Sequence, residues 1–262
     1  MKSGGIHIHN KSLNKIGTFV FLHVLLLIIS VFFSSCGHQS NKVSEITSLL
    51  KKAYGAESEE NKIVDFTVTG NIIYYNYYGQ QKTQIKFKES FKYPGKIRID
   101  LYFDNYVVSD SWDGVYAREK IGESKPQKIN PNRFITNLRI NRFPYIFFEQ
   151  TYKFTVMENE IINNDTCFVL SGRYSGHEVT KYFINKNNGF LMRYQGRSHF
   201  AQPGMLTLEF ENMQKINGRL HSGRIIYYIN NHLFKIKNIE TVKYNNDVHD
   251  LYFNLEKELV LI

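Results

Sequence analysis

Paired carboxylates are the residues of this chain whose type and spacing come nearest to catalytic groups. Asp110 and Asp113 form one pair, and Glu209 and Glu211 form another. Two carboxylates that flank a sugar linkage serve as acid and base in glycosidases, but the simpler interpretation of each is an exposed strand or turn carboxylate. Ser175 lies one place too late between its glycines to form a nucleophile elbow. We therefore predict no catalytic residue and a protein that is not an enzyme.

The sequence also contains few of the motifs that bind metals or cofactors. There is no phosphate-binding glycine loop and no His-Glu-x-x-His pair. Predicted turns and strands separate the histidines of the later chain, which are His177, His199, His221, His232 and His249. We therefore expect no metal and no cofactor. Cys167 opens the apolar run Cys167–Leu170, which favours a buried, inert thiol over a nucleophile.

Cys36 follows a segment with the pattern of a targeting signal. Residues 1–35 contain three lysines and no acid, and an apolar run extends from Ile16 to Phe33. This is the pattern of a secretory signal peptide. Ser34-Ser35-Cys36 resembles the lipobox of bacterial lipoproteins, although Phe33 stands where Leu is usual. The resemblance implies that Cys36 is lipidated, with chains such as palmitate, and becomes the new N-terminus.

Two other interpretations of this segment stay open. About 18 apolar residues can just span a bilayer, which would make the segment an uncleaved anchor. Ordinary secretion is the third possibility. All three interpretations place the rest of the chain outside the cytoplasm.

The composition is that of a folded, strand-rich protein. The 262 residues include 20 Phe and 18 Tyr, and only 2 Cys. Aromatic and β-branched residues favour strands, and so few cysteines exclude a disulfide scaffold. Without residues 1–35 the chain has a net charge of +6, with basic residues spread along its length. This excess suits an anionic membrane surface or a simple solvated surface, and we expect no nucleic acid partner.

The hydropathy pattern predicts one helix followed by a mainly β domain. After a tether at residues 36–42, apolar residues at helical spacing predict a helix over 43–53 that Gly55 ends. Apolar and polar residues then alternate, as in Lys96–Leu101 and Leu206–Phe210, which indicates antiparallel strands with one wetted face. Turn signals separate nine to eleven such strands, at residues 93–95, 113–114, 187–189, 203–204 and 217–218.

One stretch, residues 122–150, lacks this alternation and holds three prolines. We expect it to cross one face of the sheet, with a short helix within Asn132–Ile140. An ordinary surface connection is the alternative. The domain is predicted to extend over residues 43–262, with an overall mainly β (α+β) class.

From about Glu45 to Phe253 the chain resembles the outer-membrane lipoprotein-sorting protein family, which includes the lipoprotein carrier and acceptor of the Lol pathway. The segments that carry the resemblance follow one another in order: residues 53–55, 66–70, 93–100, 109–114, 165–170, 181–185, 188–191 and 216–218. The resemblance implies a curved antiparallel half-barrel, closed by helices, whose concave face holds acyl chains.

Two features mark this chain as a divergent member. The carrier has an arginine directly before the hairpin proline that helps to control acyl-chain release, and Tyr93 stands in that place here. Lipidation at Cys36 also fits the membrane-anchored acceptor better than a soluble carrier.

The predicted function is therefore non-enzymatic binding of the acyl chains of lipids or lipoproteins. The predicted location is a Gram-negative cell envelope, with the protein lipid-anchored in the outer membrane and facing the periplasm. An envelope sensor or interaction protein on the same fold is the alternative, and a hydrolase of envelope material is a third.

The apolar positions of the alternating strands are the candidate lipid-binding residues: Ile85, Phe87, Ile97, Ile99, Leu101, Leu206, Leu208 and Phe210. Each of them could instead be ordinary core. Arg98 alternates onto the opposite face, where a polar substitution is expected to change neither stability nor binding.

Overall fold

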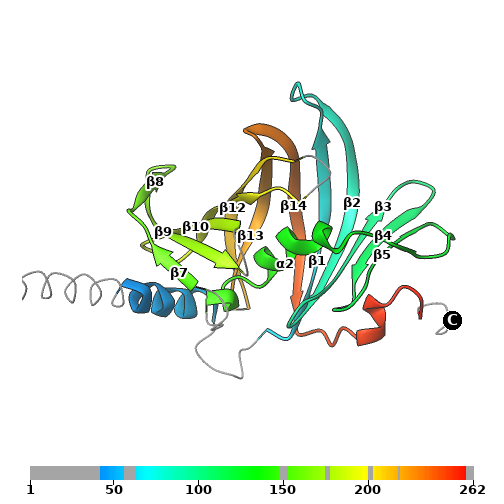
Figure 1. The fold of residues 1–262 in the computed structure, drawn as a ribbon, viewed down its shortest axis with the longest axis horizontal. Helices are drawn as coiled ribbons and strands as arrows, with labels where there is room; N and C mark the ends of the chain where they lie inside the picture. Colours follow the sequence, from blue (N-terminus) through cyan, green and yellow to red (C-terminus); the bar gives the residue numbers. More distant parts are fainter. Residues whose placement is uncertain are drawn as a thin grey trace, which may run out of the picture. The chain divides into compact units, whose positions relative to one another are not determined.

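Alternating apolar and polar residues build an antiparallel sheet that curves around an inner face (Figure 1). The computed structural model describes residues 42–55, 63–147, 153–174, 178–199, 203–217 and 219–257. The predicted signal peptide and Cys36 lie outside these residues. The chain divides after Glu45 into two units, and the second, residues 46–262, contains the whole sheet.

The described residues contain fourteen strands, more than the nine to eleven expected from the sequence. That prediction was low because three strands have only two to four residues, too few to show alternation. The strands are β1 (Asp65–Tyr75), β2 (Gln81–Lys92), β3 (Lys96–Tyr102), β4 (Val107–Trp112), β5 (Ala117–Ile121), β6 (Gln127–Lys128), β7 (Lys153–Val156), β8 (Glu160–Ile162), β9 (Asp165–Tyr174), β10 (Glu178–Asn185), β11 (Leu191–Arg197), β12 (Met205–Ile216), β13 (Arg219–Ile229) and β14 (His232–Tyr244).

The strand order is β6-β5-β4-β3-β2-β1-β14-β13-β12-β11-β10-β9-β7, with β8 paired to β9. Among the described strands, the first and the last thus pair with each other inside the sheet. The predicted turns fall between consecutive strands. Several turns without Gly or Pro were missed, among them Asn163-Asn164 and Asn230-Asn231, where both residues have positive φ. Asparagine tolerates that conformation and so forms tight hairpins.

The segment between β6 and β7 crosses the sheet, as expected. Because these two strands lie at opposite ends of the strand order, their connection has to traverse the whole sheet. It contains η2 (Pro131–Phe134), α2 (Ile135–Asn141) and η3 (Tyr145–Phe147). Phe134 and Ile146 on this segment are buried, so it covers the inner face and is not a surface connection.

The predicted helix is present over residues 42–54. Within the domain its buried residues Ile46, Leu50 and Tyr54 recur every four positions and join the same core as the sheet. Gly55 follows with a φ of +66°, a conformation that suits glycine at a helix end. Among the described residues, no helix has the length and apolar character needed to cross a bilayer.

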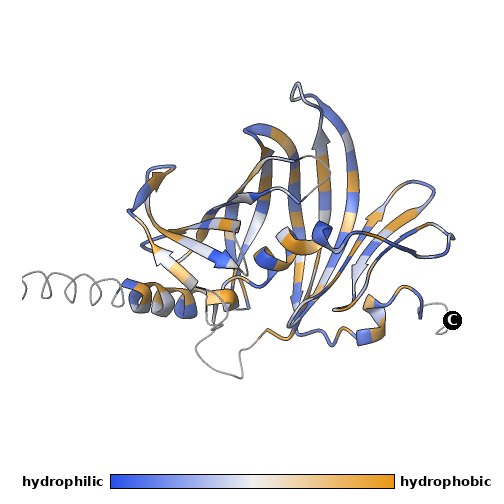
Figure 2. Cartoon of the chain, in the orientation of Figure 1, coloured by the Kyte–Doolittle hydropathy of each residue, from blue (hydrophilic) through white to orange (hydrophobic). Residues whose placement is uncertain are grey.

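The outer face of the sheet is not exposed to solvent along its whole extent. Figure 2 shows hydrophobic and hydrophilic residues alternating along the long strands, but the C-terminal segment with η4 (Asp250–Phe253) packs over β3 and β4. Beneath it, Arg98 is buried and its Nε lies 2.8 Å from Asp100 Oδ1. Arg98 lies on the opposite face as predicted, but the expectation that this face is exposed to solvent was wrong here, because alternation cannot reveal a distant segment that covers the face. The effect of substituting Arg98 stays a prediction.

Candidate functional site

The strand register places all eight candidate lipid-binding residues on the inner face. Ile85 pairs with Ile72 of β1, and Phe87 pairs with Leu101 of β3. Across β14, β12 continues the same face, since Phe210 pairs with Ile225 of β13. The crossing segment packs against this face and leaves two spaces between itself and the sheet.

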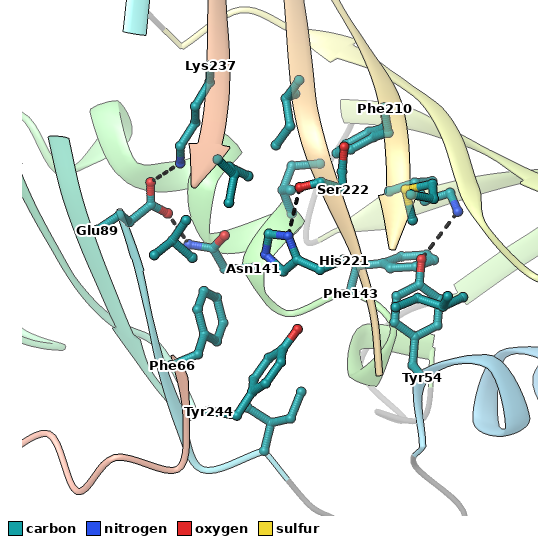
Figure 3. Close-up of a pocket in the computed structure, with 18 residues that line it drawn as sticks. Tyr54, Phe66, Glu89, Asn141, Phe143, Phe210, His221, Ser222, Lys237 and Tyr244 are labelled. Carbon is teal, nitrogen blue, oxygen red and sulfur yellow. Dashed lines mark hydrogen bonds and ion pairs between the residues drawn. The ribbon is translucent and has the colours of Figure 1, made fainter. Parts of the chain in front are cut away.

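The smaller space is an apolar pocket of about 100 Å³. It lies between the sheet, Tyr54 and the end of α2, and Figure 3 shows its lining. Its apolar walls include Phe66, Val68 and Phe210. One of the eight candidates, Phe210, thus lines this pocket.

The larger space is a cavity of about 560 Å³. Its apolar lining consists of Ile72, Tyr74, Ile99, Leu101, Phe134, Tyr227 and Phe234. Two further candidates, Ile99 and Leu101, therefore face open space and are only partly buried. The other five candidates are buried and line neither space. Which of the eight contact a ligand stays a prediction.

Both spaces share a buried ion pair that was not predicted. Lys237 Nζ of β14 lies 2.6 Å from Glu89 Oε2 of β2, and Asn141 Nδ2 of α2 donates to Glu89 Oε1 at 2.6 Å. Figure 3 shows the three side chains converging. Burial alone would raise the pKa of Glu89, but Lys237 and the two hydrogen bonds hold it below its usual value. The Lys237 ammonium also lies 4.5 Å from the centre of the Phe87 ring.

A second lysine, Lys235, lines the larger cavity beside this pair. Its ammonium lies 4.5 Å from the centre of the Tyr227 ring and 5.9 Å from that of Tyr74. Burial, and then the neighbouring charge of Lys237, lower the pKa of Lys235 to about 8, against the opposing effect of Glu89. Two cations thus stand close together on the inner face of one strand.

Arg133 of the crossing segment forms ion pairs with residues of β4 and β5 at the rim of the same cavity. Arg133 Nη2 lies 2.9 Å from Asp110 Oδ2, and Arg133 Nη1 lies 3.2 Å from Glu119 Oε2. Burial raises the pKa of Asp110 to about 6, with Arg133 acting against the shift and Glu119 adding to it. Asp110 is thus not the exposed carboxylate expected from the sequence, because it faces the cavity.

Tyr93, which occupies the arginine position of the carrier, also contacts the crossing segment. Its hydroxyl donates to the Asn141 carbonyl oxygen at 3.2 Å. Its ring packs edge-on against Phe91 and Tyr145, with centroids 4.9 and 5.2 Å away. At this position the chain therefore has an aromatic anchor for the crossing segment in place of a charge.

The carboxylates considered for catalysis are each paired with an arginine. Asp113 binds Arg118, and Glu209 binds Arg193 at 2.6 Å. Glu211 binds Arg224 at 3.2 Å. Within the described ranges, no group of three or more metal-ligating side chains comes together.

Cys167 is fully buried, in line with its apolar neighbours. Burial raises the pKa of its thiol to about 11, with Asp165 adding to the shift. A thiol in such a site stays protonated at neutral pH.

Comparison with known proteins bears first on the fold. No family model and no curated protein matches the sequence, but several solved structures match the fold. A LolA superfamily protein from Nitrosomonas europaea is 16% identical, with a TM-score of 0.58 over 79% of this chain and 96% of its own. The chain has the LolA-like open half-barrel fold.

Two further structures agree with the LolA-like fold. A putative outer membrane lipoprotein-sorting protein domain from Vibrio parahaemolyticus is 13% identical, with a TM-score of 0.55 over 84% of this chain and 97% of that one. A DUF1329 family protein from Desulfovibrio piger is 12% identical, with a TM-score of 0.54 over 82% of this chain and 96% of that one. The LolA-like fold predicted from the sequence is thus confirmed.

Proposed function

We propose that this protein binds an acyl chain of a lipid or lipoprotein in the larger cavity of the inner face, without catalysing a reaction. The observation that carries the proposal is the cavity of about 560 Å³, bounded by Ile99, Leu101 and several aromatic rings. Small-molecule sites are typically concave spaces of about 300–1,000 Å³, and this cavity has a volume within that range. Its seven apolar or aromatic residues lie beside nine polar or charged ones, which include Asn130, Asn132, Asn137 and His199. The LolA-like fold and the predicted lipid anchor at Cys36 support the same assignment.

Lipidation at Cys36 would also determine where the protein is located. A chain lipidated at Cys36 would be held at a membrane of a Gram-negative envelope, with the domain facing the periplasm from the outer membrane. The partners are then the acyl chains themselves and the membrane that receives the anchor.

The open cavity favours binding over the two alternative functions. A sensor that acts through protein contacts needs no open space behind the crossing segment. A hydrolase would need an acid and a base free to act, but the two carboxylates lining the cavity, Glu89 and Asp110, are each held by a cation.

The test is titration of the full chain with 1-decanol, an uncharged ten-carbon chain, by calorimetry in a non-ionic amphipol. At about 0.8 kcal/mol per buried methylene, full burial supplies up to about 8 kcal/mol, which corresponds to a Kd of micromolar order. Absence of binding would reject the proposed function.

Ile99→Trp locates the binding site. The larger ring enters the cavity, so decanol binding should weaken at least tenfold. The loss in free energy of unfolding should stay below the 1–3 kcal/mol typical of an overpacked core. The matched control is Lys86→Trp, at an exposed position on the outer face of β2, which should leave decanol binding unchanged. Unchanged binding by Ile99→Trp, with a large loss of stability, would show that Ile99 is core.

A further inference from the structure

The larger cavity carries charge that a hydrocarbon chain does not need. Its charged lining residues are the cations Arg133, Lys235 and Lys237 and the carboxylates Glu89 and Asp110. Charged groups removed from water cost free energy unless they are paired. A site that bound only hydrocarbon would gain from apolar residues at these positions, so the charges point to a polar part of the ligand.

The positive charge is concentrated on β14. Asp110 faces Arg133 at the rim, and Glu89 receives Lys237 and Asn141. Lys235 lies two residues before Lys237 on the same face of the strand, and Glu89 acts electrostatically on both ammonium groups.

The surroundings of Lys235 suit a cation that receives an anion. In the register Lys235 lies between Tyr74 of β1 and Tyr227 of β13, and the Phe234 ring centre is 5.8 Å from its ammonium. Aromatic faces attract a cation but carry no net charge. The rings therefore hold the ammonium in place through cation–π contacts alone, and these contacts contribute no counter-charge.

We propose that the cavity takes a single-chain amphiphile with an anionic head group, and that Lys235 and Lys237 bind the head. This inference rests on the proposed function and adds the chemistry of the ligand. A carboxylate or phosphate head accepts charge-assisted hydrogen bonds from the ammonium groups and relieves their mutual repulsion. Ile72, Ile99 and Leu101 then contact the chain.

The ionisation of Lys235 is consistent with this assignment. Its pKa of about 8 leaves it mostly charged at neutral pH. The other titratable and charged groups that line this cavity are Tyr74, Glu89, Asp110, Arg133, His199, Tyr227 and Lys237. A bound anion adds negative charge to them. Binding should therefore raise the pKa of Lys235, and the affinity for an anionic chain should fall as the pH rises above 8.

The experiment compares decanoate, decyl phosphate and 1-decanol, which share a ten-carbon chain and differ in the head. Calorimetry at pH 7 with the full chain should show about tenfold tighter binding of an anionic chain than of decanol. Tighter binding of decyl phosphate than of decanoate would indicate a lipid phosphate, and the reverse order a fatty acid. Equal binding of all three would overturn the anionic head while leaving the proposed function standing. Failure to bind any of them would reject both.

Substitutions test the lysine itself. Lys235→Met should remove most of the preference for the anionic chains over decanol, and Lys235→Arg should restore that preference. Lys86→Met, at an exposed lysine on the outer face of β2, is the matched control and should keep it. An unchanged preference in Lys235→Met would exclude the assigned role. The comparison of heads in wild type needs no variant, so it holds even if Lys235→Met does not fold.

Discussion

Removal of one partner from the buried ion pair should destabilise the domain far more than removal of both. Glu89 and Lys237 are 4% and 7% exposed, and their charged atoms are 2.6 Å apart. Glu89→Gln leaves the Lys237 ammonium buried without its carboxylate and close to Lys235. An uncompensated buried charge of this kind costs about 3–5 kcal/mol.

The paired substitution Glu89→Leu with Lys237→Met removes both charges together. Apolar replacements for a buried pair are often neutral or stabilising. The partly buried Asn141 loses its acceptor at the same time, which costs at most about 1–3 kcal/mol, the value for a fully buried unsatisfied donor. The double variant should therefore lie within about 2 kcal/mol of wild type.

Urea denaturation and thermal unfolding of the full chain, both followed by circular dichroism, measure these differences. In a domain of this size 1 kcal/mol shifts Tm by about 2–4 °C, so Glu89→Gln should lower Tm by about 6–20 °C. The matched control is Glu211→Gln, which breaks the more exposed pair with Arg224 and should cost less than about 1 kcal/mol. The reasoning fails if Glu89→Gln lowers the free energy of unfolding no more than this control does. It also fails if the loss in the double variant equals the sum of the losses in the two single variants.

Three further predictions concern single side chains. Because burial raises the pKa of Asp110 to about 6, above its unfolded value, its contribution to stability is full below about pH 4 and is lost as the pH rises through 6. Asp110→Asn should remove this dependence and gain up to about 3 kcal/mol on wild type between pH 4 and 7; parallel pH profiles in urea denaturation would contradict this. Cys167 is buried with a raised thiol pKa, so a polar maleimide should label it only in denaturant, and rapid native labelling seen by peptide mass spectrometry would refute its inertness. Cys36→Ala should release the protein from membranes or block its processing. If that variant still fractionates with membranes at the normal mature mass, the lipidation prediction fails.

Individual strands and the helix could be predicted from the sequence better than the contacts between distant segments. Alternation in Lys96–Leu101 and helical spacing after Val43 identified the strand β3 and the helix. Both patterns report which side of a single element meets the core, so they need no knowledge of distant partners. The same limitation explains Arg98, since the residues that bury it arrive from the C-terminus, about 150 positions later.

Only some of the charged residues that line the cavity could be predicted from the sequence. Glu89 lies between Phe87 and Phe91 at an inward position of its strand, and Lys235 and Lys237 alternate with apolar residues in β14. Glu89 could therefore have been singled out as unusual, whereas the alternation of the two lysines with Phe234 and Ile236 predicts that they face outward. The ion pair between Glu89 and Lys237 could not be predicted from the sequence. The two residues come together only because β1, which pairs with β2, also pairs with β14.

The pairing of β1 with β14 also has a consequence for how the chain folds. The strands β2–β6 lie on one side of this ladder and β7–β13 on the other, so the two halves of the sheet join only when the last strand has been synthesised. Contacts between such distant residues slow folding. A secreted chain with this topology would cross the membrane before its sheet could close, and would complete the inner face only on the far side.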